Sequence, residues 1–384
     1  MPQLNQYINE VTIPGTREFA NKAAGLDDCI DLTLGQSDFP PPASVKSAMI
    51  NAINDNQLRY THNRGLITLR QAIAQSIKKK FNVDYDAETE IVVTNGGSEA
   101  IDDVFRTIIN PGDEVILPSP CYLGYEPILK LLGATVVLVD TTKTNLVPTP
   151  EAIKAAITDK TKAVLFNYPT NPTGKTLTLE QINQLTEMLK DEDIFIVTDE
   201  IYSENVYEGP HHSFLEKLEL RDKLFVINGL SKSHAVTGAR IGYVVSSAEL
   251  ITHVTSVHLY NSICVATPSQ YGAIEAFKDR ETVKEMNQAY IERRDFLYDK
   301  LQTLGLPVEK PQGAFYIFPN ISKYNNNAYQ FATELLNQER LAVVPGSAFS
   351  KYGEGHIRLS FASSMDELKE AMKRLERFLK HYKN

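Results

Sequence analysis

Cysteine is scarce in this 384-residue chain. The three cysteines, Cys29, Cys121 and Cys264, are odd in number and far apart, which argues against a disulfide framework and fits a reducing compartment. The eight histidines show no metal-ligand spacing beyond the adjacent pair His211 and His212, which we interpret as an exposed loop. We therefore expect no metal site.

Long apolar runs and basic blocks are also absent. No stretch approaches the ~18 apolar residues that a membrane helix needs, and the first residues, MPQLNQYINEV, lack the basic start and apolar stretch of a signal peptide. The formal net charge is -9, and we interpret the longest basic run, Lys78–Lys80, as the solvated end of a helix. We expect a cytoplasmic protein with neither a membrane nor a nucleic-acid partner.

The middle of the chain contains a series of short apolar runs, most of them rich in β-branched residues. Longer amphipathic segments, such as Thr178–Lys190, separate most of these runs. Strands that alternate with helices predict a parallel sheet covered on both faces, and the last two runs are joined without a full helix, which indicates one antiparallel strand. The runs are Glu90–Val93, Glu114–Leu117, Thr135–Val139, Ala163–Phe166, Ile194–Val197, Leu224–Ile227 and Ile241–Val245.

The two ends of the chain differ from the middle. The beginning is rich in loop formers, including Pro40–Pro42, and the last third mixes helical stretches with strand-like pieces. We predict an α/β fold with two domains. The large domain, residues 46–275, holds a mostly parallel seven-stranded sheet between helices, and residues 1–45 and 276–384 form a smaller α+β domain.

Polar residues follow several strands at the edge where open parallel sheets bind ligands. Gly96 and Gly97 open a helix after the first strand, which turns free N–H groups toward any phosphate, although an ordinary turn also explains them. The loop Asn167–Gly174 after the fourth strand is rigid and rich in amides. Asp199 ends the fifth strand, where a buried carboxylate either caps a helix or pairs with a cation such as a protonated pyridine nitrogen.

Lys232 follows the sixth strand, among small residues. A lysine at a helix start is disfavoured because its charge opposes the positive helix end, and Arg240 comes eight residues later. It is the conjunction of these features at one edge of one sheet that predicts a ligand site.

In this order the motifs resemble those of the class I/II aminotransferases, which are pyridoxal-phosphate enzymes of fold type I. The resemblance covers nearly the whole chain, and the string GLSKSH around Lys232 is similar to the branch of the acetyl-diaminopimelate aminotransferases. The matching motifs are Leu34–Gln36, Tyr60–Thr61, Gly65, Gly96–Ser98, Asn171–Gly174, Asp199–Tyr202, Ser231–Lys232, Gly238–Gly242, Gly313–Tyr316 and His356–Arg358.

The resemblance implies a catalytic role for three residues. Lys232 would hold pyridoxal 5'-phosphate covalently and, once displaced by the substrate amine, would move protons. Asp199 would bind the pyridine nitrogen. Tyr202 and Asn171 would bind the phenolic oxygen of the cofactor, and Tyr122 would stack on its ring.

The resemblance also implies where the anionic groups bind. Gly97, Ser98 and Arg240 would hold the cofactor phosphate, with Tyr60 reaching it from the other subunit of a homodimer. Many members have a serine where this chain has Gly229, so one phosphate contact falls to Ser231 or a water. Substrate binding would fall to Arg358, Gly35 and Asn171.

The implied reaction is the ping-pong transfer of an amino group between an amino acid and a 2-oxo acid. Acetyl-diaminopimelate and 2-oxoglutarate, in lysine biosynthesis, are the leading substrates. A carbon–sulfur β-lyase on the same scaffold is the alternative, followed by a non-catalytic cofactor-binding module. We interpret Arg17 as a surface helix arginine in preference to a residue at the substrate mouth. Ser119–Pro120 and Asn171–Pro172 are predicted to be cis.

Overall fold

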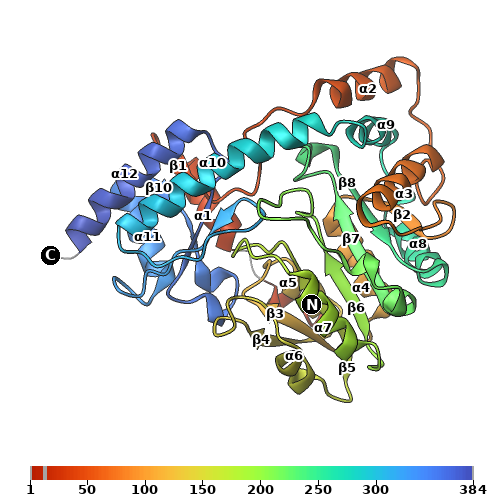
Figure 1. Cartoon of the computed structure of the whole chain (residues 1–384), viewed down its shortest axis with the longest axis horizontal. Helices are drawn as coiled ribbons and strands as arrows, with labels where there is room; N and C mark the ends of the chain where they lie inside the picture. Colours follow the sequence, from red (N-terminus) through yellow and green to blue (C-terminus); the bar gives the residue numbers. More distant parts are fainter. Residues whose placement is uncertain (1, 12–14, 383–384) are drawn as a thin grey trace.

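The computed structural model describes residues 2–11 and 15–382 (Figure 1). Its larger part is built on a seven-stranded sheet in the order β2-β8-β7-β6-β5-β3-β4. Only β8 is antiparallel to its neighbours, which confirms both the seven predicted strands and the single antiparallel one. The strands are β2 (Ile91–Asn95), β3 (Glu114–Ser119), β4 (Thr135–Asp140), β5 (Thr161–Asn167), β6 (Phe195–Asp199), β7 (Leu224–Gly229) and β8 (Ile241–Val245).

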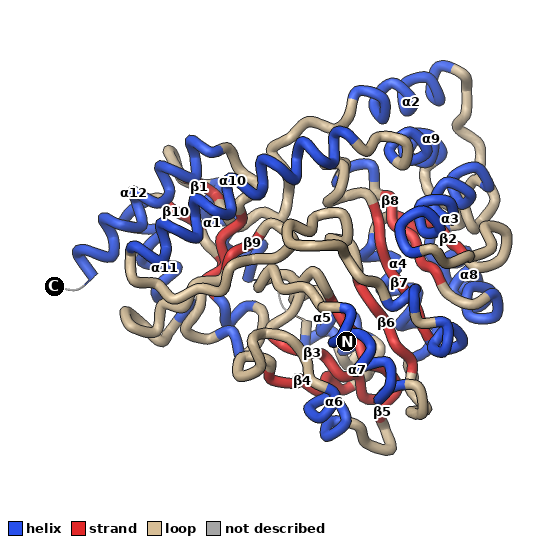
Figure 2. The backbone as a smooth tube through the Cα atoms, in the orientation of Figure 1, coloured by secondary structure: helices blue, strands red, loops and turns tan. Residues whose placement is uncertain are grey.

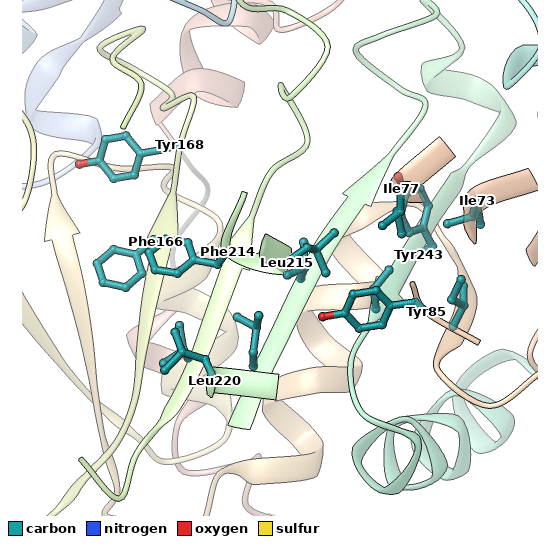
Figure 3. Close-up of a cluster of buried hydrophobic side chains, with 14 of the residues drawn as sticks. Ile73, Ile77, Tyr85, Phe166, Tyr168, Phe214, Leu215, Leu220 and Tyr243 are labelled. Atoms are coloured by element: carbon teal, nitrogen blue, oxygen red, sulfur yellow. The ribbon is translucent and has the colours of Figure 1, made fainter. Parts of the chain in front are cut away.

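The strand residues alternate between two apolar cores because successive side chains of a strand point to opposite faces. In β5, Val164 and Phe166 belong to one core, and Ala163 and Leu165 belong to the other. Figure 3 shows part of the first core, where the rings of Phe166 and Phe214 stack with centroids 5.3 Å apart. Both faces of the sheet are therefore covered.

Two sets of helices supply the other halves of these cores. The first set is α2 (Ala43–Asn54), α3 (Ile67–Phe81), α6 (Pro150–Ala156), α7 (Leu179–Leu189) and α9 (Thr267–Ala276). The second set is α4 (Gly97–Ile108), α5 (Tyr125–Leu131) and α8 (Ala248–Ser262). Helices α2 and α9 come from distant parts of the chain and lie side by side at one end of the molecule (Figure 1). The basic run Lys78–Lys80 falls in the last turn of α3, as predicted.

The smaller part combines both chain ends around a separate apolar core (Figure 2). Strand β1 (Ile30–Asp31) pairs in parallel with β10 (Leu341–Ala342), and β12 (Ile357–Ser360) lies between β11 (Val344–Pro345) and β9 (Tyr316–Ile317) in an antiparallel sheet. An α+β part built from both ends is therefore present, whereas the boundaries at residues 45 and 275 stay a prediction. Its helices are α1 (Gly15–Ala24), α10 (Glu281–Thr303), α11 (Ala328–Glu339) and α12 (Met365–Tyr382).

None of the helices within residues 2–11 and 15–382 combines the length and the apolar character that crossing a membrane requires.

Candidate active site

A cavity of about 310 Å³ opens beyond the carboxyl ends of the parallel strands, where they meet the smaller part of the molecule. This is the edge that the sequence predicts, because ligands of open parallel sheets bind where the strands end. Its lining includes ten of the eleven predicted site residues: Gly35, Gly97, Ser98, Tyr122, Asn171, Asp199, Tyr202, Lys232, Arg240 and Arg358.

Asp199 is a buried carboxylate at the end of β6. The Tyr125 hydroxyl donates to its Oδ2 at 2.7 Å, and the Ile201 N–H donates to its Oδ1 at 3.0 Å. Burial raises the pKa of Asp199 to about 6, against the lowering effect of these two donors. No basic side chain of residues 2–11 and 15–382 forms an ion pair with it, so a ligand cation would find an unopposed carboxylate here.

Lys232 lies in a turn after β7, and its Nζ donates to the Gly35 carbonyl at 2.5 Å. Burial lowers the pKa of this lysine to about 8, with further lowering by the positive charges of Arg358 and Arg240. An amine with such a pKa is neutral in roughly a fifth of the molecules near pH 7.4, far more than an ordinary lysine. A neutral amine can attack a carbonyl carbon or accept a proton.

Arg358 is a fully buried guanidinium on β12. Its Nη1 donates to Asn171 Oδ1 at 3.1 Å, its Nη2 donates to the Thr33 carbonyl, and its Nε has no hydrogen-bond partner. The ring of Tyr316 lies 4.3 Å from the guanidinium carbon. Within the described ranges no carboxylate pairs with Arg358. A buried cation with an unused N–H suits a bound carboxylate.

Gly96 and Arg240 form a second anion site at the start of α4. A Cβ at Gly96 would lie 2.4 Å from Arg240 Nη2, so a glycine is what lets the guanidinium rest on this loop. Arg240 donates to the carbonyls of Thr237 and Asn95, at 3.1 Å and 3.3 Å. A helix N-terminus beside an arginine with no carboxylate partner is suited to a phosphate.

Gly229 leaves no room for the serine that many aminotransferases have at this position. A Cβ at Gly229 would lie 2.6 Å from the Ile241 carbonyl oxygen, which belongs to the neighbouring strand. Ser231 lines the cavity, as one of the two proposed substitutes for that contact.

Tyr60 is the predicted site residue that this cavity does not include. Its side chain is 79% exposed, on a loop that α9 anchors: the Thr267 hydroxyl donates to the Arg59 carbonyl at 2.8 Å, and Gln270 Nε2 donates to the Thr61 hydroxyl at 3.0 Å. The role of Tyr60 in a neighbouring subunit stays a prediction.

Sequence reasoning missed three features of the site. Arg17 is an exposed arginine of α1, as the preferred interpretation has it, but it also lines the cavity. Tyr125, the partner of Asp199, is the first residue of α5, and its ring packs edge-on against that of Tyr122 with centroids 5.2 Å apart. The Tyr316 hydroxyl bonds to the Tyr202 hydroxyl at 2.8 Å, and Tyr316 ends a motif that the sequence singled out without giving it a role.

The cis peptide bonds predicted at Ser119–Pro120 and Asn171–Pro172 are confirmed. A third one, at Tyr168–Pro169 in the same loop as Asn171, was not predicted.

Comparison with known proteins agrees with this geometry. The chain matches the family "Aminotransferase class I and II" over residues 27–375. It is 47% identical to a probable N-acetyl-LL-diaminopimelate aminotransferase of Bacillus subtilis, over 98% of this chain and 95% of the relative. It is 37% identical to an aspartate aminotransferase of Thermotoga maritima, over 98% and 99%. The solved structure of a Pyrococcus protein called protein-A1 superimposes with a TM-score of 0.96 at 35% identity, over 99% and 100%.

The fold and the cavity are thus those of a fold-type-I transferase that depends on pyridoxal phosphate. The chain belongs to the class I and II aminotransferases. The comparisons favour aminotransfer over the carbon–sulfur lyase alternative.

The residues of the cavity fit this cofactor. The amine of Lys232 would hold the cofactor aldehyde, the carboxylate of Asp199 would pair with its basic ring nitrogen, and Arg240 at the start of α4 would hold its phosphate. The unused Nε of Arg358 leaves a further place for an anionic group of the substrate.

Proposed function

We propose that this enzyme transfers an amino group between N-acetyl-L,L-diaminopimelate and 2-oxoglutarate, in lysine biosynthesis. The observation that carries the aminotransferase site is the buried Arg358, with an unused Nε, in one cavity with Lys232 and Asp199. The substrate follows from the relative with 47% identity, against 37% for the aspartate aminotransferase of Thermotoga maritima.

The bound cofactor supplies an electron sink for the bond that breaks at the substrate Cα. Asp199 holds a negative charge beside the ring nitrogen and so favours its protonated form. Tyr202 and Asn171 orient the phenolic oxygen, and Tyr122 stacks on the ring. These assignments are supported by the positions of all four side chains in the cavity lining.

Lys232 has two tasks in this proposal. Its amine would hold the cofactor aldehyde, and its free Nζ would take the proton from the substrate Cα. The second task requires a neutral amine and is supported by a pKa lowered to about 8.

The phosphate and the substrate carboxylate bind to different arginines of the cavity lining. Gly97, Ser98 and Arg240 hold the phosphate through backbone N–H groups, a hydroxyl and a planar guanidinium. Arg358 forms a two-bond contact with the substrate α-carboxylate, and Asn171 and Gly35 position it.

The enzyme acts as a homodimer in the cytoplasm, with Tyr60 of each subunit reaching the phosphate of the other. Support comes from exposed apolar side chains that surround the anchored loop and would be covered in a dimer. They are Ile50, Ile53, Leu58 and Tyr260, the last being 90% exposed. Free Cys29, Cys121 and Cys264 suit a reducing compartment.

The test is an absorption spectrum of the purified holoenzyme before and after glutamate is added, beside Lys232→Ala. The wild type should show a glutamate-dependent change in the cofactor absorbance that 2-oxoglutarate reverses, and the variant should show none. Acetyl-diaminopimelate should produce the same change at lower concentrations than aspartate. A spectrum that no amino acid alters would overturn the proposal.

A further inference from the structure

Tyr316 is a buried residue of the cavity lining to which the proposed function gives no task. It lies on β9, and its hydroxyl is 2.8 Å from the Tyr202 hydroxyl. No other group of residues 2–11 and 15–382 forms a hydrogen bond with the Tyr316 hydroxyl. A Cβ at Gly35 would collide with this hydroxyl, so the glycine is what leaves room for it in the lining.

The ring of Tyr316 makes a second contact with the site, because it lies 4.3 Å from the guanidinium carbon of Arg358. A cation over an aromatic face is held by electrostatic attraction. Tyr316 therefore contacts Tyr202 through its hydroxyl and Arg358 through its ring. A phenylalanine keeps the ring and lacks the hydroxyl, so the two contacts can be separated by substitution.

The bond between the two hydroxyls acquires a direction when the cofactor binds. In the ligand-free protein either hydroxyl can donate, and burial raises the pKa of both Tyr202 and Tyr316, so both keep their hydrogen near neutral pH. A tyrosine has only one hydrogen to donate. If Tyr202 donates it to the ionised phenolic oxygen of the cofactor, Tyr316 must donate to Tyr202. Hydrogen bonds in a chain polarise one another, so the first bond strengthens the second.

We propose that Tyr316 is a positioning residue that acts through Tyr202, whose hydrogen bond to the phenolic oxygen of the cofactor it orients and strengthens. This inference rests on the proposed function, because it needs Tyr202 to bind that oxygen. A stronger donor stabilises the negative charge on the phenolic oxygen. The cofactor held by Lys232 therefore loses its proton at a lower pH than it would without Tyr316.

The test is a pH titration of the cofactor absorbance in the holoenzyme, which needs no turnover. In Tyr316→Phe the midpoint should rise by roughly 0.3 to 1 pH unit, as expected for one weakened hydrogen bond. Tyr290→Phe is the matched control, since it removes a buried hydroxyl of the same core that bonds to Ser37 at 2.6 Å outside the cavity lining, and its midpoint should stay at the wild-type value.

Two further variants separate the hydroxyl from the ring and from Tyr202. Binding of the unreactive acid butyrate, measured by calorimetry, should be unchanged in Tyr316→Phe and weaker by roughly 2- to 5-fold in Tyr316→Leu, which loses the ring beside Arg358. The double variant Tyr202→Phe with Tyr316→Phe should have the midpoint of Tyr202→Phe alone, because Tyr316 acts only through Tyr202.

An unchanged midpoint in Tyr316→Phe, an equal shift in Tyr290→Phe, or additive shifts in the double variant would each overturn the inference. If Tyr316→Phe moves the midpoint as expected but no amino acid alters the spectrum of the wild type, the proposed function fails and the role of Tyr316 stands.

Discussion

The Tyr125 hydroxyl donates a hydrogen bond of 2.7 Å to the buried Oδ2 of Asp199, in a part of the cavity lining with no basic partner for that carboxylate. The bond favours the ionised acid, and burial opposes it strongly enough to hold the pKa near 6. The ionised carboxylate of Asp199 therefore destabilises the ligand-free protein, and it is suited to pair with a cationic group of the cofactor.

Asp199→Asn should stabilise the ligand-free protein while abolishing function. The pKa of Asp199 is about 6 in the folded protein, against an ordinary value of 3.8. Ionisation of Asp199 therefore lowers the free energy of unfolding as the pH rises from 3.8 through 6. At pH 7.5 the variant should be more stable than the wild type by about 1–3 kcal/mol. At pH 3.5 this advantage should vanish. Urea unfolding of both cofactor-free proteins measures it, and equal stabilities at pH 7.5 would refute it.

Lys232 should react as an amine of pKa about 8 in the ligand-free protein. Acylation of Lys232, followed by peptide mass spectrometry, should therefore reach half of its maximal rate near pH 8. Arg358→Met removes a nearby positive charge, which should move the midpoint upward toward 10.5. A midpoint that stays in place in this variant would show that Arg358 does not contribute to the lowered pKa of Lys232.

His258 should make the stability of the protein depend on pH. Its Nδ1 lies 3.4 Å from Glu99 Oε2 and 3.5 Å from Asp103 Oδ2. Burial alone would lower the pKa of His258, but the two carboxylates raise it to about 9. A raised pKa stabilises the fold fully below the ordinary value of 6.5, and this stabilisation is lost as the pH rises through 9.

Between pH 6.5 and pH 9.5, the wild type should therefore lose about 1–3 kcal/mol of unfolding free energy that His258→Gln does not lose. His253, exposed on the same helix, offers the matched control, and His253→Gln should follow the wild type. Parallel curves for the wild type and His258→Gln would contradict the predicted ion pairing.

Tyr60→Ala and Lys232→Ala should complement each other. If Tyr60 serves the neighbouring subunit, a hybrid dimer has one site that retains both Lys232 and Tyr60. Equal mixing with free subunit exchange should then restore about a quarter of the wild-type activity, because half of the dimers are hybrids with one intact site. If Tyr60 serves its own subunit, no hybrid has an intact site, and the mixture should be no more active than its components.

The parallel sheet and the residues at its edge could be predicted because local patterns encode both. Short β-branched runs placed all seven strands, and the rule that ligands bind beyond the strand ends placed Asn171, Asp199 and Lys232 in one cavity. The cost of burying a carboxylate pointed to a cation beside Asp199, whereas the roles of Asn171 and Lys232 came from the resemblance to the aminotransferases.

Residues from the chain ends were harder to place. Arg17 lies on α1, which packs against β10 and β11 more than three hundred residues away, and no local pattern encodes that packing. Tyr125 was missed because a tyrosine at the start of an apolar helix is most simply explained as a core residue. The Arg358–Asn171 contact likewise joins two parts of the chain that only the folded structure brings together.

The close approach of β7 and β8 at Gly229 has an evolutionary consequence. A serine at Gly229 would have to displace the backbone carbonyl of Ile241. The next residue, Gly242, is also closely packed, because a Cβ on it would lie 2.4 Å from the carbonyl carbon of Gly96. A single mutation to serine therefore carries a structural penalty before it can offer any benefit. A serine contact to the proposed phosphate site would therefore require a change in the neighbouring strand first.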